Sequence, residues 1–565
     1  PMHADCGMNW GPQNMSAMWL GTRYTFTLFL SDHPIFSRKV EEVRKEALKL
    51  LYSFTNDAGA CSACAHYAGA SMVPILNLLQ QMQRRGVMDA FATEPRLARY
   101  AEWEMQLLTP PEPRFGGLRK IVAVGDGSTE QSTRIGQIGT GFARSNPALS
   151  ARLMGAWQAM GQPHDNFYGA SALKIDPTLP AVSPKLGSAQ FDGWMSVLRH
   201  GWETPNETAI HFINGDYLTD HRHGDMGSLV IYALGAPLSL DWGPIYYPRV
   251  AGSYMHSMAL PESVLGFPWA GDRPPLDKPA EGWSVWHGQT RHTPLLDFTE
   301  SSSASADFGR GKDRAMSWRR TVRNLHPDPA HPVIVIEDTF GGNDLAGKPV
   351  ISTLNMMAEG EVDTPAGVQA PELRMHTPDQ NTAPEKLPSA GPVFPLPAGL
   401  NKFAFTGQWG IDWELYTDAE VAMQASLGNW GNSWHPSTEQ SQFRKANNNK
   451  PYEERQHILR LRGQDAMRVI ILPYRKGDRP NPFTVEKRDG QLLIRGNMTA
   501  LALTEQGYSA EIFTAAGRRQ SLTAFGAEPV EDFGLRIAGG PAELVITETG
   551  GTLTVGGPAG ERTIT

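Results

Sequence analysis

The sequence predicts an α+β chain of several domains, with helices in its first third and antiparallel strands afterwards. Its 565 residues exceed what one ordinary core accommodates, so two or three domains are expected. Apolar residues recur at helical spacing up to about residue 190, whereas short β-branched and aromatic runs between turn residues follow. Helices first and strands afterwards, without alternation, indicate segregated α and β domains.

Four segments of the first part carry the helical pattern. In the first of them, Val43, Ala47 and Leu51 fall on one face, with Lys and Glu between them. Loops rich in Gly, Pro and Asn separate the segments, which suggests stacked helical hairpins, an α-solenoid or a toroid. The predicted helices are 38–54, 71–82, 94–108 and 149–160.

The strand pattern begins near residue 195 and continues to the end of the chain. Short strands bounded by turn residues over more than 300 positions predict stacked antiparallel sheets. We therefore divide the chain into a helical part, 1–190, an antiparallel β-sheet domain, 191–455, and a smaller C-terminal β-sheet domain, 456–565. The clearest strand segments are 227–243, 331–340, 467–474, 490–495, 542–548 and 551–557.

Charge and cysteine content narrow the function classes. A net charge of −8 provides no basic footprint for nucleic acid or an anionic membrane, and no apolar run is long enough to span a bilayer. The CSAC spacing of Cys61 and Cys64 lacks a thioredoxin-like βαβ context. A disulfide from Cys6 to either of them and three free thiols both remain open.

The strongest chemical signal lies in GDYLTDHRHGDMGSLVIYALGAPLSLDWG, residues 215–243. His221, His223 and Asp225 alternate, so an extended segment would direct them to the same side. Asp241 ends the next strand-like run, and His256 follows in GSYMHSM. Two imidazoles and a carboxylate suit a tetrahedral Zn²⁺ site. From spacing alone, surface or hydrogen-bonded core histidines are the commoner explanation.

The motif H-x-H-x-D-x-G-S, followed by a strand, Asp-x-Gly, a Tyr pair and a later His-Ser, resembles the heparinase II/III-like polysaccharide lyases. Three further segments resemble the same superfamily, whose members include heparin, heparan and alginate-oligomer lyases. They are CGMNWGPQNMSAMW (6–19), AGACSACAHYAGASM (58–72) and WRRTVRNLHPDPAHPVIVIEDTF (318–340). Where some relatives carry a histidine after the asparagine, this chain has Trp10.

The resemblance implies an (α/α) toroid, incomplete in this chain, followed by an antiparallel β-sandwich and a small C-terminal β domain. It also implies a periplasmic or secreted enzyme acting on an acidic polysaccharide or oligosaccharide, with a separate N-terminal polypeptide or a homo-oligomer as a further partner. The implied catalytic set is Asn9, Tyr67 and His221, and the implied ligands of a structural Zn²⁺ are His223, Asp241 and His256. Lesser candidates for substrate contact are His66, Tyr168, Arg222 and Tyr246.

β-Elimination explains why such an enzyme needs these residue types. The proton beside the uronate carboxylate is weakly acidic, so a neutral amide such as that of Asn9 must stabilise the enolate-like charge. Tyrosine has a reference pKa of about 10, so a Tyr67 base needs a cationic or hydrogen-bonding neighbour. Histidine is the residue type that titrates near neutrality, so His221 is a natural partner. Whether Tyr67 acts alone or shares the proton transfers with His221 depends on the sugar epimer.

Two other classes of protein compete with a lyase. A glycoside hydrolase on a helical toroid needs two carboxylates that flank the scissile bond, and Glu203, Glu207, Asp216 and Asp225 are available. A non-catalytic carbohydrate-binding protein would keep the fold without the site. Asn9 is also a plausible helix cap, and Tyr67 a plausible core residue. The presence of Asn9, Tyr67 and His221 together favours the lyase.

Overall fold

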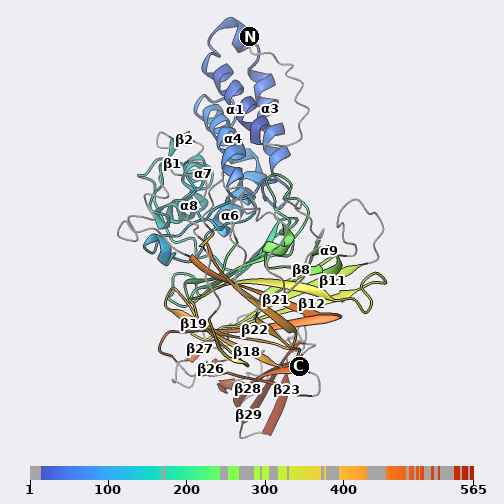
Figure 1. The fold of residues 1–565 in the computed structure, drawn as a ribbon. Helices are drawn as coiled ribbons and strands as arrows, with labels where there is room; N and C mark the ends of the chain where they lie inside the picture. Colours follow the sequence, from blue (N-terminus) through green and yellow to red (C-terminus); the bar gives the residue numbers. More distant parts are fainter. Residues whose placement is uncertain are drawn as a thin grey trace.

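Helices occupy one end of the computed structural model and strands make up the rest (Figure 1). The helical end is formed by the first part of the chain, and the last strands, β28 and β29, lie at the opposite end of the molecule. The residues that the structure describes are 14–166, 169–170, 174–241, 252–265, 286–292, 296–303, 316–326, 330–370, 375–376, 394–428, 454–478, 483–488, 491–495, 497–501, 511–513, 519–521, 540–547, 550–557 and 560–564.

The four predicted helices are confirmed as α3, α4, α6 and α8. Local signals explain several of their ends: Asn146 accepts a hydrogen bond from the Leu149 amide at the start of α8, and Glu41 and Glu42 lie in the first turn of α3. The helices are α1 (Asn14–Phe29), α2 (Pro34–Ser37), α3 (Val40–Phe54), α4 (Tyr67–Arg84), α5 (Ala90–Thr93), α6 (Pro95–Gln106), α7 (Arg134–Phe142), α8 (Pro147–Ala159) and α9 (Glu262–Leu265), with 3₁₀ turns at Pro113–Phe115 and Ser253–Met255. No helix in the described part of the chain has the length and apolar character needed to cross a membrane.

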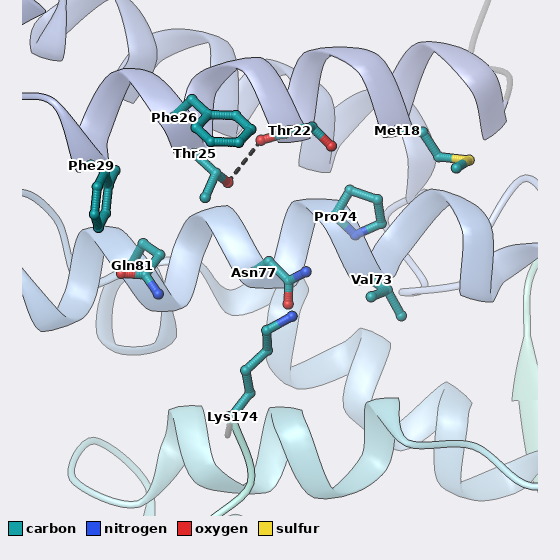
Figure 2. Close-up of a pocket in the computed structure, with 11 residues that line it drawn as sticks. Met18, Thr22, Thr25, Phe26, Phe29, Val73, Pro74, Asn77, Gln81 and Lys174 are labelled. Atoms are coloured by element: carbon teal, nitrogen blue, oxygen red, sulfur yellow. Dashed lines mark hydrogen bonds between the residues drawn. The ribbon is translucent and has the colours of Figure 1, made fainter. Parts of the chain in front are cut away.

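Helices α1 and α4 pack closely because a glycine faces a proline. A Cβ at Gly21 would lie 2.7 Å from the Cβ of Pro74, so only glycine permits this approach. Beside the contact is a groove of about 420 Å³ between the two helices, and Lys174 reaches into it (Figure 2). Phe26 and Phe29 of α1 border the groove and are 63% and 70% exposed, so this face of α1 is apolar and open among the described residues.

The strands form two large sheets, antiparallel except for the parallel pair of β16 and β20, and several smaller sheets. One large sheet has the order β15-β14-β18-β19-β22-β12-β11-β10-β9, and the other has β16-β20-β21-β13-β8, with β17 paired to β20. Phe405 of the first sheet contacts His457 of the second, and Arg320 of the first donates to Ser352 of the second. The two sheets therefore face each other over a shared core. A separate five-stranded sheet, β3-β4-β5-β6-β7, lies next to the helices.

The described strands of the first half of the β region have these bounds: β1 (Asp165–Asn166), β2 (Gly169–Ala170), β3 (Ala189–Phe191), β4 (Met195–His200), β5 (Thr208–Ile213), β6 (Leu229–Ala233), β7 (Ala236–Ser239), β8 (Ala259–Pro261), β9 (Trp286–His292), β10 (Leu296–Ser303), β11 (Ser317–Leu325), β12 (Val333–Gly341), β13 (Val350–Met357), β14 (Val362–Thr364) and β15 (Gly367–Gln369). The later ones are β16 (Met375–His376), β17 (Phe394–Leu396), β18 (Asn401–Thr406), β19 (Ile411–Thr417), β20 (Glu420–Gly428), β21 (Glu454–Gly463), β22 (Ala466–Arg475), β23 (Thr484–Arg488), β24 (Gln491–Arg495), β25 (Asn497–Leu501), β26 (Glu511–Phe513), β27 (Arg519–Ser521), β28 (Gly540–Thr547), β29 (Gly550–Gly557) and β30 (Gly560–Ile564).

The sheet pairing corrects the domain boundary that we placed between residues 455 and 456. Strand β22 pairs with β12 on one side and β19 on the other, in the middle of the nine-stranded sheet. Strand β21 likewise joins β13 to β20 in the second large sheet. The sequence pattern identified both strands but carried no information on their partners. The boundary therefore cuts through paired strands instead of separating two domains.

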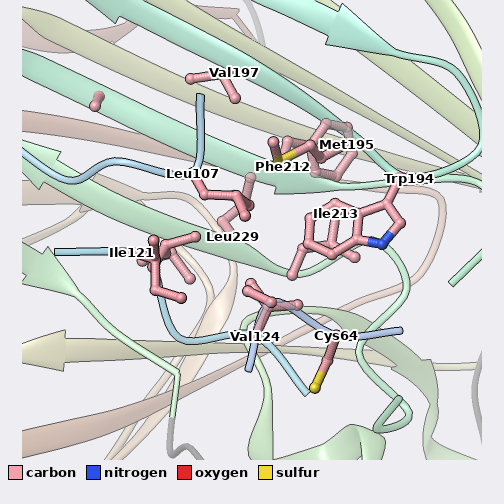
Figure 3. Packing of buried hydrophobic residues seen from close by; sticks show 14 of the residues in the cluster. Cys64, Leu107, Ile121, Val124, Trp194, Met195, Val197, Phe212, Ile213 and Leu229 are labelled. Carbon is pink, nitrogen blue, oxygen red and sulfur yellow. The ribbon is translucent and has the colours of Figure 1, made fainter. Parts of the chain in front are cut away.

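Apolar packing joins the helical part to the five-stranded sheet. Trp194 and Phe212 of the sheet region lie with Leu107, Val124 and Cys64 of the helical region in one continuous cluster (Figure 3). Cys61 and Cys64 are both buried and form no disulfide with each other, and Cys6 falls outside the described residues. Burial in this cluster raises the pKa of the Cys61 thiol to about 12.

A buried ion network reinforces the same junction. Glu207 accepts from Arg119 at 2.9 and 2.7 Å and from Arg199 at 2.6 Å, and the Glu207 and Arg199 side chains are fully buried. His211 of β5 hydrogen-bonds through Nε2 to the carbonyl of Gln106, at the end of α6, at 3.1 Å. Burial and the nearby Arg199 lower the pKa of His211 from 6.5 to about 3. The junction therefore requires a neutral imidazole at this position.

We expect His211 to make the stability of the fold pH-dependent. The imidazole is neutral in the fold but takes up a proton on unfolding below about pH 6.5, so its full contribution is present above that pH. Between about pH 6.5 and 3 the free energy of unfolding should fall by roughly 1.4 kcal/mol per pH unit on its account. Urea unfolding of His211→Gln, which cannot titrate, should show a shallower decline than the wild type. The exposed His33, changed to Asn, is the control and should leave the slope unaltered; equal slopes for all three proteins would contradict the assignment.

Candidate active site and metal centre

Backbone hydrogen bonds bring the start of α4 against the loop that carries His221. The amides of Thr219 and Asp220 both donate to the carbonyl of Ser62, at 2.9 and 3.0 Å, and the amide of Cys64 donates to the carbonyl of Asp220 at 3.1 Å. Ala63 and Asp220 form a parallel bridge. Tyr67 is the first residue of α4, three residues beyond Cys64. The helical part and the sheet part are thus joined by main chain within a few residues of both Tyr67 and His221.

Tyr67 and His221 lie face to face at this junction. Their ring centroids are 3.4 Å apart and the ring planes differ by 5°, so the phenol and the imidazole are stacked. The side-chain amide nitrogen of Asn14, at the start of α1, lies 3.4 Å from Nε2 of His221. The structure therefore gathers a phenol, an imidazole and an amide, the three chemical groups that the sequence resemblance implied. The amide described beside His221 is that of Asn14, and Asn9 lies outside the described residues.

His66 also contacts Tyr67. Its ring meets the Tyr67 ring edge-on at 5.0 Å, and its Nδ1 contacts both carboxylate oxygens of Glu130, at 2.8 and 2.9 Å. His66 is only 2% exposed. This burial favours a supporting role for His66 over the substrate contact that we had considered.

The loop around His221 is not the extended segment that the alternating pattern suggested. His221 has φ +56°, in the left-handed region that residues other than glycine rarely adopt. Even so, His221 and His223 turn toward one common partner, Asp126. Nδ1 of His221 lies 2.8 Å from one carboxylate oxygen, and Nε2 of His223 lies 2.9 Å from the other.

Asp126 is the site residue that sequence reasoning missed. Burial alone would raise its pKa, but the hydrogen bonds from His221 and His223 hold the pKa well below its usual range, so Asp126 is a carboxylate. The signal for it was the Gly-Asp-Gly sequence that follows the apolar run 121–124. Nothing in that signal pointed to histidines almost a hundred residues away.

His223, Asp241 and His256 form a buried cluster that fits a metal ion. Each can supply a ligand atom, and these atoms lie within 4.8 Å of one another. Nδ1 of His256 contacts Asp241 at 2.7 Å. Nδ1 of His223 is buried and has no hydrogen-bond partner among the described residues, because Nε2 is the atom that donates to Asp126. Two imidazoles, one with a bare nitrogen, and a carboxylate are a donor set that Zn²⁺ accepts.

Arg320 of the nine-stranded sheet contacts two segments near this cluster. Its guanidinium donates to the carbonyls of Gly227 and Ser257, at 2.7 and 2.5 Å, and pairs with both oxygens of Asp338 at 2.7 Å. Arg320 is almost fully buried. Because Ser257 follows His256 directly, the Arg320 side chain limits the movement of His256 relative to the sheet.

The remaining predicted residues differ in whether the structure describes them and in how exposed they are. Arg222 is exposed beside His221, whereas Tyr168 and Tyr246 fall outside the described residues. Two of the carboxylates considered for a hydrolase are inaccessible: Glu207 is enclosed by two arginines, and Asp225 is fully buried and accepts from the Gly125 amide. Burial also raises the pKa of Asp225. The groove between α1 and α4 is lined by neither Tyr67 nor His221.

Solved structures with a similar fold exist, although the sequence comparisons find no match. No family model and no curated protein matches the sequence. Among solved structures, this α+β multidomain arrangement is similar to heparinase III: a heparinase III gene product (TM-score 0.56, 13% identity, 91% of this chain) and a second heparinase III (0.55, 12%, 90%). Heparan sulfate lyase HepC from Pedobacter heparinus is also similar (0.53, 10%, 90%).

The chain has a heparinase III-like fold. It spans 66%, 67% and 66% of the length of these three structures. At such low identity the likeness concerns the fold, whereas function must be argued from the site.

Proposed function

We propose that this protein is a polysaccharide lyase that cleaves a uronic-acid-containing glycan by β-elimination and leaves an unsaturated uronate end. The stacked pair of Tyr67 and His221 is the observation that carries the proposal. The similar structures include heparinase III and a heparan sulfate lyase, which supports the same class of reaction. The enclosed Glu207 and Asp225 argue against a pair of carboxylates acting as in a glycoside hydrolase.

In the proposed reaction, Tyr67 and His221 carry out the proton transfers. Tyr67 takes the proton on the carbon beside the uronate carboxylate. The C–H electron pair becomes the new carbon–carbon double bond as the bond to the glycosidic oxygen breaks. Tyr67 or His221 then protonates that oxygen. A positive charge on the stacked His221 would stabilise the phenolate form of Tyr67, and a side-chain amide would stabilise the negative charge on the substrate carboxylate.

The more detailed assignments are part of the same proposal. Helices α1 to α8 would belong to an (α/α) toroid and the two large sheets to a β-sandwich. The substrate is an acidic polysaccharide or oligosaccharide, and the enzyme works in the periplasm or outside the cell. The open apolar face of α1 supports a covering partner, either a separate polypeptide or a second copy of the chain.

Zn²⁺ at His223, Asp241 and His256 would have a structural role. The ion would keep the loop that presents His221 in place, because His223 is two residues from His221. The donor set and the bare Nδ1 of His223 support this assignment.

The lyase proposal predicts that Tyr67→Phe and His221→Ala each reduce elimination at least about 100-fold, the usual contribution of a proton-transfer group. Tyr67→Phe keeps the ring that stacks on His221, so its unfolding midpoint should match the wild type. The measurement is the absorbance of the conjugated product on heparan sulfate, alginate, glucuronan, hyaluronan and a sulfated algal glycan. New reducing ends without this absorbance would indicate a hydrolase, and binding without either product would indicate a carbohydrate-binding protein. Full activity of Tyr67→Phe would remove Tyr67 as the base.

The amide can be assigned by replacing two asparagines separately. The resemblance implies Asn9, whereas Asn14 is the described amide beside His221. We expect Asn14→Ala to lower kcat by about 10²-fold with little change in KM, because the amide acts on charge that develops during the reaction. If Asn9→Ala alone has this effect, the role belongs to Asn9.

The metal proposal predicts one Zn²⁺ per chain, lost in His223→Ala and in His256→Ala. Zinc at 100 times its Kd should raise the free energy of unfolding of the wild type by about 2.7 kcal/mol. The unfolding midpoint should therefore rise as well. Metal analysis and thermal unfolding with and without a chelator measure both effects. His33→Asn, at an exposed helix cap, is the control. An unchanged midpoint on chelation would contradict the proposal.

A further inference from the structure

The Gly125–Asp126–Gly127 turn is held against the histidine loop by hydrogen bonds from its backbone amides. The Asp126 amide donates to the carbonyl of His221 at 3.0 Å, and the Gly125 amide donates to a carboxylate oxygen of Asp225 at 3.1 Å. Gly125 has φ +59°, and a Cβ there would lie 2.6 Å from the His221 carbonyl oxygen. These contacts fix the turn against the His221 loop. The Asp126 carboxylate is thereby placed next to the two histidines of that loop.

The two oxygens of Asp126 divide between two imidazoles. A carboxylate only accepts hydrogen bonds, so the proton of His221 must be on Nδ1 and that of His223 on Nε2. Nε2 of His221 is then the atom left to face Asn14, at 3.4 Å, and Asp220, at 3.9 Å. Nδ1 of His223 is left bare at the metal cluster. One side chain thus selects the tautomers of both histidines.

Resting on the lyase function proposed above, we propose that Asp126 is a positioning residue that couples the metal centre to the catalytic imidazole. It presents Nε2 of His221 to the substrate and Nδ1 of His223 to a divalent cation through the same carboxylate. A change in how one histidine is held is transmitted to the other through two hydrogen bonds of 2.8 and 2.9 Å. Removal of Asp126 therefore impairs cation binding and turnover together, because Asp126 acts through the imidazoles of His223 and His221.

The test compares Asp126→Asn, Asp126→Glu and Asp126→Ala with the wild type and with Asp176→Asn. The control Asp176 also accepts side-chain and backbone hydrogen bonds, from Thr178, but lies in an exposed turn. We expect Zn²⁺ affinity, titrated with a competing chromophoric chelator, to fall about 10- to 100-fold in Asp126→Ala, the usual effect of losing a carboxylate behind a metal-ligating histidine. On the best glycan substrate kcat should fall by a similar factor, with KM nearly unchanged. Asp126→Glu should recover part of both losses.

Imidazole ¹⁵N NMR supplies a readout that does not depend on activity. The wild type should show His221 protonated on Nδ1 and His223 on Nε2, and Asp126→Ala should lose both preferences, whereas Asp176→Asn should keep them. A wild-type His221 whose Nδ1 carries no proton overturns the inference, even if the variants do not fold. Weaker Zn²⁺ binding with unaltered His221 tautomer and kcat also overturns it, because the two sites would then be uncoupled.

Failure of the proposed function would look different. No elimination on any glycan would reject the lyase assignment, while the tautomers and the Zn²⁺ affinity would still report whether Asp126 links the two histidines. Normal elimination with unaltered tautomers and affinity in Asp126→Ala would reject the link alone.

Discussion

The short run of main-chain hydrogen bonds between residues 62–64 and 219–220 is the contact on which the candidate site depends. It joins the end of one loop in the helical part to the loop before His221 in the sheet part. These backbone hydrogen bonds fix the register of the two segments, because each buried amide and carbonyl needs a hydrogen-bond partner. Tyr67 and His221 follow within a few residues on either side, so their stacking is a consequence of this register.

Around that contact, the junction is unusually rich in buried charge. Glu207 with Arg119 and Arg199, and Glu104 with Arg134, are ion pairs whose side chains are almost fully enclosed. Buried pairs add little net stability compared with apolar packing, but losing one partner is costly. The main effect of these buried ion pairs is therefore to disfavour other placements of the helices on the sheet. The proposed catalytic pair, drawn from two parts of the fold, would require that kind of restriction.

The same arrangement would allow the proposed structural ion and the proposed catalytic imidazole to share one loop. His221 adopts a left-handed backbone conformation, and His223 follows two residues later. Asp126 contacts both rings, Tyr67 stacks on His221, and His223 also lies in the cluster with Asp241 and His256. Arg320 extends this restriction to the large sheet, through the carbonyls of Gly227 and Ser257.

Much of this protein was predictable from its sequence. Helical spacing located α3, α4, α6 and α8, and runs such as 331–340 and 467–474 located β12 and β22, because periodicity depends on which face is buried. The resemblance singled out Tyr67, His221 and the trio of His223, Asp241 and His256. Tertiary structure alone decided the partners: β22 in the middle of a sheet, Asn14 beside His221, and Asp126 between two histidines. These depend on contacts between residues distant in the chain, which neither local propensity nor spacing encodes.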